Sequence, residues 1–147
     1  MKRWAPKVGA IAYALWGLLH IWAGGLMLSA DLPAQIDYLS TAPIDVQALP
    51  PDTEPIVHAA LSFHSYNLIW FGLLAFVVAI LLNWRNSLTG YLVNLVVVGA
   101  DDLGLMWFLI LPGHLTFGDA GLGPVLFVVA LVFTSIGVLD RKPASQM

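Results

Sequence analysis

The chain has 147 residues, of which 59% are hydrophobic and 10% are charged, and its formal net charge is −3. A soluble domain of this size is normally far more polar, so the composition favours a membrane protein. Only six residues are Lys or Arg, which excludes a basic surface for nucleic acid. The chain has no cysteine, which excludes disulfides and thiolate metal sites.

Four apolar segments predict four helices, at residues 8–29, 58–82, 87–111 and 122–139. At about 1.5 Å per residue, each segment spans or nearly spans a hydrocarbon core of about 30 Å. Four helices of a soluble bundle would need polar outer faces, which these segments lack. We therefore expect an all-α fold: a single-domain integral membrane four-helix bundle, covering residues 1–147, with a long outer loop at residues 30–57.

The first segment also resembles a secretory signal peptide, because three basic residues precede an apolar run that ends in Leu28-Ser29-Ala30. The run is long for such a peptide and contains Trp16, His20 and Trp22, so we interpret it as a retained helix. The loop at 30–57 contains five prolines, with room for a short helix at 32–39. Such a loop either covers an outward-facing cavity or is simply mobile.

The basic residues predict the orientation in the membrane. All six lie at the N-terminus, in the turn at 83–86 or at the C-terminus, whereas the loop at 30–57 holds only acidic charges. By the positive-inside rule, both termini and the turn at 83–86 are expected to be cytoplasmic. The bacterial inner (cytoplasmic) membrane is the expected location.

Glycines on two of the predicted helices indicate close helix packing, because small residues let helix backbones approach each other. They are Gly17, Gly24 and Gly25 on the first helix and Gly99 and Gly104 on the third.

Two adjacent carboxylates, Asp101 and Asp102, lie within the third apolar segment, which carries no other charge. A charged side chain in hydrocarbon is costly, so such residues usually face the bundle interior and have a partner. His20, His64 and Asp102 each lie about 12–13 Å below the outer end of their predicted helices. Ionisable groups at one depth on three helices predict a shared site in the outer half of the membrane.

The predicted site comprises five polar residues on three helices: His20, His64, Asn67, Asp101 and Asp102. Asn94, which shares a helix face with Asp101, and the deep Trp107 are further pocket candidates. Each histidine alone would also fit a core residue bonded to a backbone carbonyl. Together, the residues fit either a ligand with its orienting carboxylate or a proton relay.

From His58 to the C-terminus the chain resembles the membrane-bound styrene oxide isomerases. The likeness rests on the four predicted spans, on a second helix that opens with a His, and on the spacing from this His to Gly90. It also includes the runs Leu115-Thr-Phe-Gly118 and Gly121-Leu-Gly-Pro124.

The resemblance implies a trimeric enzyme that binds haem b and isomerises an aryl epoxide to an aldehyde. It places the axial haem ligand at His58, and a family asparagine falls on His64. The reacting pocket would then be lined by His64, Asn67, Asp101 and Asp102, with a small apolar epoxide or similar molecule as substrate. The family's catalytic tyrosine falls near Met106 and its buried aspartate near Val98, so this chain departs from the family pattern. These departures indicate either a different chemistry on the same scaffold or loss of the isomerase reaction.

Two other functions fit the same residues. A non-enzymatic membrane subunit or carrier would use the His/Asp cluster to bind haem, a metal, a quinone or a lipid head group, or to relay protons. In a purely structural protein, the cluster would be an interhelical hydrogen-bond clamp.

Overall fold

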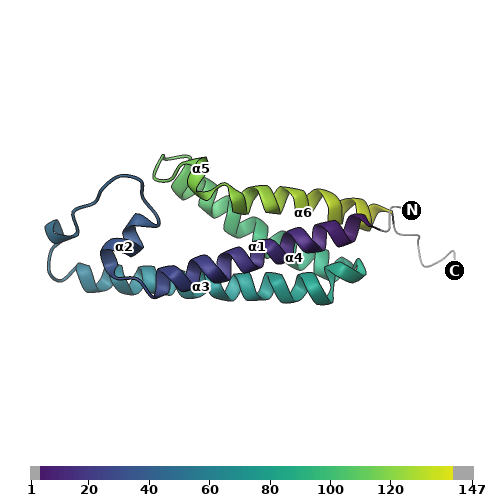
Figure 1. Ribbon diagram of the computed structural model, residues 1–147, viewed down its shortest axis with the longest axis horizontal. Coiled ribbons are helices and arrows are strands. Elements are labelled where there is room, and N and C mark those ends of the chain that lie inside the picture. Colours follow the sequence, from purple (N-terminus) through teal and green to yellow (C-terminus); the bar gives the residue numbers. More distant parts are fainter. Residues whose placement is uncertain (1–3, 141–147) are drawn as a thin grey trace.

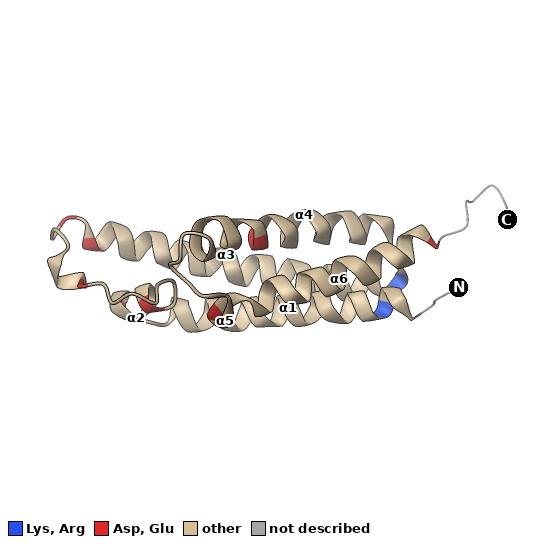
Figure 2. Ribbon diagram, turned by 90° about the horizontal axis from the view of Figure 1, so that it is seen from above, with Lys and Arg blue, Asp and Glu red and all other residues tan. Residues whose placement is uncertain are grey.

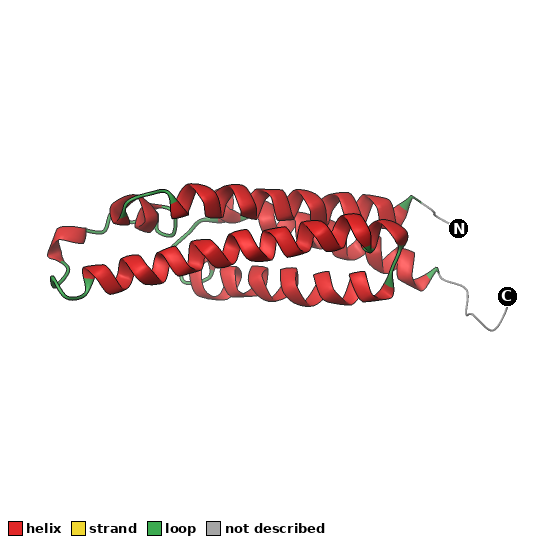
Figure 3. Ribbon diagram, turned by 90° about the horizontal axis from the view of Figure 1, so that it is seen from below, coloured by secondary structure: helices red, strands yellow, loops and turns green. Residues whose placement is uncertain are grey.

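The structure, a computed structural model, describes residues 4–140, and this part of the chain is helical with no strand (Figures 1 and 3). Four long helices lie side by side in an elongated bundle, which confirms the predicted all-α class. They are α1 (Ala5–Leu28), α3 (Glu54–Leu81), α4 (Leu88–Leu105) and α6 (Leu122–Leu139). The short elements are α2 (Leu32–Asp37), α5 (Phe117–Ala120), the 3-10 turns η1 (Val46–Ala48) and η2 (Asn83–Arg85), and the π-helical turn η3 (Met106–Ile110).

All four long helices are long and apolar enough to cross a membrane, with η2 extending α3 and η3 extending α4. Large apolar side chains such as Leu15, Phe63 and Val96 are exposed on the outer surface of the bundle, while polar side chains such as Asn94 and Asp102 are buried inside it. An apolar exterior around a partly polar interior is the arrangement that lipid favours, because hydrocarbon cannot hydrogen-bond to polar groups.

The predicted helix boundaries differ from the observed ones mainly at the start of α3. The sequence predicts a start at residue 58, but α3 begins at Glu54, with a proline in its first turn. Proline is well tolerated at the first helical position, where its missing N–H has no intrahelical partner anyway. His58 therefore lies within the second turn of the helix rather than opening it.

Helix α1 is central to the packing, with α3 and α6 as its main neighbours. A Cβ built on Gly17 would lie 2.5 Å from the Gly72 carbonyl oxygen, and one on Gly24 would lie 2.7 Å from the Ser65 carbonyl oxygen. The backbones of α1 and α3 are thus in direct contact, as the glycine pattern predicts. The pattern also includes Gly25 and Gly104. A Cβ built on either of them would have no atom of another helix within 4 Å, so for these two the packing prediction is wrong.

The outer loop is anchored at two points near its beginning. Gln35 of α2 is fully buried, and its amide donates hydrogen bonds to the Met27 carbonyl (3.0 Å) and to Ser62 Oγ (3.3 Å). Further along, the Thr41 N–H donates to the His114 carbonyl (2.8 Å) and so joins the two loops at this end of the bundle. A cavity of about 310 Å³ lies beneath the loop, lined by residues that include Ile36, Leu61 and His114. Residues of the loop, of α3 and of the loop that holds His114 thus line this cavity together.

The described charges are distributed unequally between the two ends of the bundle (Figure 2). The described basic residues, Lys7 and Arg85, lie at the end where the described chain starts and finishes, and Lys7 Nζ lies 5.4 Å from the centroid of the Trp84 ring. The acidic residues of the loop at 30–57 lie at the opposite end. Four of the six bases behind the orientation prediction (Lys2, Arg3, Arg141, Lys142) fall outside the described residues.

Reporter fusions at both termini and at Arg85 are expected to read cytoplasmic, because all six basic residues of the sequence lie near a terminus or in the turn at 83–86. A fusion in the loop at 38–53 is expected to read on the other side and serves as the control. An outward reading at the C-terminus, or a mature chain that starts near Asp31, would contradict the four-span topology.

Candidate functional site

The centre of the bundle holds a polar cluster that begins on α1, where Trp16 and His20 lie one helical turn apart on the buried face. Their rings stack, with centroids 3.6 Å apart and planes inclined by 20°. His20 Nδ1 lies 2.9 Å from the Trp16 carbonyl oxygen. Because a carbonyl oxygen only accepts, Nδ1 carries the proton and donates this bond. The position and tautomer of the imidazole are therefore fixed from within α1.

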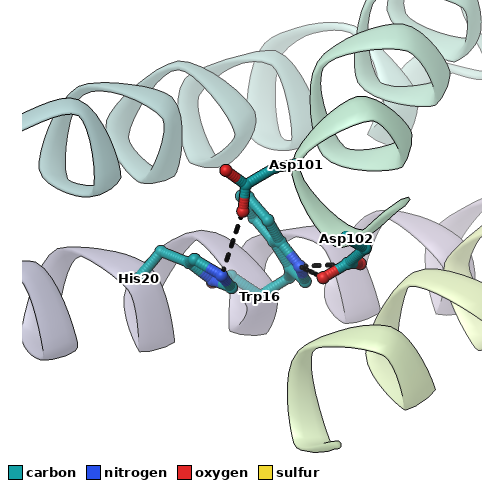
Figure 4. A network of polar contacts seen from close by, with 4 residues as sticks. All are labelled: Trp16, His20, Asp101 and Asp102. Atoms are coloured by element: carbon teal, nitrogen blue, oxygen red, sulfur yellow. Dashed lines mark hydrogen bonds and ion pairs between the residues drawn. The ribbon is translucent and has the colours of Figure 1, made fainter. Parts of the chain in front are cut away.

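Helix α4 brings two carboxylates to these rings (Figure 4). Trp16 Nε1 donates to both oxygens of Asp102, at 3.3 and 3.2 Å. Asp101 Oδ2 lies 3.5 Å from His20 Nε2. Adjacent residues on a helix point about 100° apart, so Asp101 and Asp102 reach the ring pair from two directions. We call Trp16, His20, Asp101 and Asp102 the His/Asp cluster.

The first turn of α6 closes the cluster on a third side. A Cβ built on Gly123 would lie 3.2 Å from Asp102 Oδ1, 3.3 Å from His20 Cε1 and 3.5 Å from Trp16 Nε1. Glycine at this position lets the α6 backbone approach three members of the cluster at once.

The protonation of His20 determines what the cluster can do chemically. With the proton on Nδ1, Nε2 of the neutral imidazole offers a lone pair toward the Asp101 carboxylate. Two acceptors that face each other need a proton or a cation between them. One ligand atom from each of His20, Asp101 and Asp102 lies within 4.8 Å of the others, which is close enough for a shared metal ion.

The interior provides no other charge compensation among the described residues. Asp102 is only 3% exposed, and both described basic side chains, Lys7 and Arg85, lie near the end of the bundle where the described chain starts and finishes. Buried charges in proteins are normally paired or bound to a metal. Two adjacent carboxylates with one imidazole therefore favour a bound cation or bound protons.

An apolar groove of about 450 Å³ leads to the cluster between α4 and α6. Asp102 is the one charged residue in its lining, and apolar side chains that include Leu103, Met106, Pro124 and Val128 form its walls. Leu103 and Val128 are also exposed on the outer surface of the bundle, so the groove opens on the side expected to face lipid.

The structure brings together His20, Asp101 and Asp102 of the predicted site, as their common depth suggests. His64 on α3 is near enough to His20 for an electrostatic interaction, but it makes no hydrogen bond to the cluster. No hydrogen bond of the Asn67 side chain to a described residue is found. His64 does not belong to the group of His and Asp residues whose ligand atoms lie close enough together, among the described residues, to share a metal.

Asn94, a predicted pocket candidate, bonds to α3 and to the turn after it rather than to the His/Asp cluster. Its amide donates to the Asn83 side-chain oxygen (3.0 Å) and to the Ala75 carbonyl (3.3 Å). Asn94 thus ties α4 to α3 and to the turn that follows it, two helical turns away from Asp102. Asn94 and Asp101 do have the spacing of residues on one helix face. The buried face of α4, however, contains Asn94, Val98 and Asp102 and not Asp101.

The tryptophan at the cluster is Trp16 and not the pocket candidate Trp107. Trp107, a predicted pocket candidate, is 68% exposed on the outer surface and does not line the groove. Trp16, absent from the predicted site, is fully buried and donates to Asp102. Its spacing of one turn from His20 is the signal in the sequence that could have identified it.

His58 is exposed in the second turn of α3 and lines neither of the two cavities. No hydrogen bond or ion pair joins its imidazole to another described residue.

In comparisons with known proteins, no family model, no curated protein and no solved structure matches this chain.

Proposed function

We propose that this chain is a membrane-embedded metal-binding protein in which His20, Asp101 and Asp102 hold one divalent cation within the bundle. The observation that supports it most is the position of His20 Nε2. Its lone pair faces the Asp101 carboxylate, a ligand atom of Asp102 lies within 4.8 Å of ligand atoms of both residues, and Nδ1–H is bonded to the Trp16 carbonyl. Metal-binding histidines almost always donate their second ring N–H to a carbonyl or carboxylate in this way.

The charge of the cluster supports the same proposal. Two carboxylates and a neutral imidazole carry two negative charges, which a divalent cation balances inside an apolar bundle. Trp16 adds a second supporting contact, because its indole N–H holds the Asp102 carboxylate toward His20. Conventional metal–ligand bonds are about 2.0–2.2 Å long, so the three side chains would close slightly around the ion.

The ligand set indicates the class of metal and of chemistry. Nitrogen and oxygen donors without thiolate suit Zn²⁺, Mn²⁺ or Fe²⁺. Three protein ligands leave at least one coordination position open, as in catalytic rather than structural metal sites. The groove beside Asp102 gives an apolar small molecule access to that position, so the site suits Lewis-acid chemistry on such a molecule.

Titration of the purified, metal-free protein with Co²⁺ tests the proposal. We expect a single equivalent to bind with visible absorption bands of a nitrogen- and oxygen-ligated site, and Zn²⁺ to displace it. The Asp52→Asn variant is the control, because Asp52 is an exposed carboxylate in the outer loop. If the wild type binds no Co²⁺ above the level of the His20→Ala/Asp101→Asn/Asp102→Asn triple variant, the cluster holds protons or a structural hydrogen bond instead.

Haem b at His58 is a separate proposal that rests on the resemblance to the styrene oxide isomerases. His58 is exposed, and it lines neither the groove beside Asp102 nor the cavity beneath the outer loop. The described residues therefore do not enclose a haem there. A haem at His58 would need cover from another chain, such as a neighbouring copy in the trimer that the resemblance implies.

A further inference from the structure

The groove between α4 and α6 combines apolar walls with one buried carboxylate at its inner end. Its volume of about 450 Å³ lies in the range of small-molecule pockets, about 300–1,000 Å³. Leu103 and Met106 form one side and residues of α6 form the other, and the groove opens between exposed side chains such as Leu103 and Val128. A molecule dissolved in the membrane could therefore enter without crossing water.

Asp102 has unused hydrogen-bonding capacity at the inner end of this groove. An ionised carboxylate offers about four acceptor sites. The structure shows one donor for Asp102, the indole N–H of Trp16, which is shared between its two oxygens. Asp102 is almost fully buried and lines the groove, so a donor group that enters there would meet an acceptor.

The backbone beside the groove departs from regular α-helix four residues after Asp102. Helix α4 ends at Leu105, and Met106–Ile110 form the π-helical turn η3, closed by the Leu111 N–H to the Met106 carbonyl (2.9 Å). Such turns are rare and are found frequently at functional sites. Here the turn begins with Met106, a flexible side chain in the wall of the groove.

We propose that the groove binds a lipophilic alcohol or phenol, with its hydroxyl group donating to Asp102 and its apolar body between α4 and α6. The apolar walls exclude a strongly polar or charged ligand, and the negative charge of Asp102 disfavours an acid. The inference deepens the proposed function, because the hydroxyl oxygen would also lie beside the open metal position. The contact between the hydroxyl oxygen and the metal rests on the proposed function, whereas binding of the alcohol or phenol in the groove does not.

Photolabelling with 4-hydroxybenzophenone tests the proposal, and benzophenone, which lacks the hydroxyl, is the matched probe. On illumination the ketone takes a hydrogen atom from a nearby C–H bond and the two radicals combine, so mass spectrometry of peptides locates the bound probe. We expect 4-hydroxybenzophenone to label groove residues such as Leu103, Met106 and Val128, and benzophenone to label exposed apolar residues around the bundle without preference.

Three variants make the test specific. Asp102→Asn is expected to reduce groove labelling by 4-hydroxybenzophenone about tenfold. This is the loss of affinity expected when a hydrogen bond to a charged group is weakened. Val128→Trp fills the groove and should reduce labelling similarly, whereas Val132→Trp, at an exposed valine one turn further along α6, should not. Size-exclusion chromatography of each variant shows whether it is folded.

Equal groove labelling by both probes, or full labelling of Asp102→Asn, would overturn the proposal and indicate a groove filled by lipid chains. If Val128→Trp turned an oligomeric wild type into a monomer and left probe labelling elsewhere unchanged, Val128 would contact a second copy of the chain. The groove would then be assigned to that second copy instead. The Co²⁺ titration separates this inference from the proposed function. Metal binding without groove labelling would contradict only the ligand, and groove labelling without metal binding would contradict only the metal site.

Discussion

Replacement of Gly24 by leucine is expected to destabilise the bundle strongly, whereas the same change at the adjacent Gly25 is expected to be tolerated. A Cβ at Gly24 would lie 2.7 Å from the Ser65 carbonyl oxygen and 3.0 Å from the Ile69 backbone nitrogen. These are backbone atoms of α3, which cannot move aside as a flexible side chain would. Overpacking of this kind typically costs about 1–3 kcal/mol and occasionally more, and for leucine against backbone we expect about 3 kcal/mol or more.

Gly25 is a close control, because it has no neighbour within 4 Å and is exposed. Leucine there should gain helix propensity worth up to about 1 kcal/mol. Thermal unfolding in detergent, followed by helical circular dichroism, should show a lower midpoint for Gly24→Leu and an unchanged or higher one for Gly25→Leu. Equal midpoints for the two variants would show that α1 and α3 are not packed as described.

The fold was predictable because it depends on long-range averages of the sequence. Segment length and hydropathy identified the four long helices, and the predicted bounds of 122–139 coincide with those of α6. The start of α3 was placed too late because Pro55 was counted among the prolines of the outer loop, although proline fits a first helical turn. Gly17 and Gly24 pack against α3, whereas Gly25 and Gly104 do not contact another helix. The difference depends on which face of a helix meets its neighbour, and composition does not specify this face.

The candidate site was predictable in part, because a buried carboxylate needs a partner. The cost of placing Asp101 and Asp102 in the membrane, together with their depth, pointed to His20 and His64 as partners, and of these His20 contacts a carboxylate. Hydropathy does not separate a buried from an exposed tryptophan, so it could not show that Trp16 is buried and that Trp107 is exposed. Gly123 carries no chemical group and contributes only by letting α6 approach, so nothing in its own identity marked it as part of the site.

Replacement of His20 by alanine is expected to weaken Co²⁺ binding by more than about 100-fold, because loss of a supporting contact alone typically costs about 10–100-fold. His58→Ala makes the same change at an exposed histidine outside the cluster and should leave Co²⁺ affinity unchanged. Isothermal titration and the visible Co²⁺ bands measure both variants.

A second variant separates metal ligation from packing, because His20 also stacks on Trp16. His20→Phe keeps an aromatic ring against the indole but has no lone pair, so it should fold like the wild type and still lose Co²⁺. Retained Co²⁺ affinity in His20→Phe would remove His20 from the proposed ligand set.

The same two histidine variants also test the haem proposal. With haem supplied during expression, a Soret band that is lost in His58→Ala and kept in His20→Phe would place haem at His58. The same band lost only in His20→Phe would place the haem iron at the His/Asp cluster, and no Soret band in the wild type would exclude the haem-dependent isomerase.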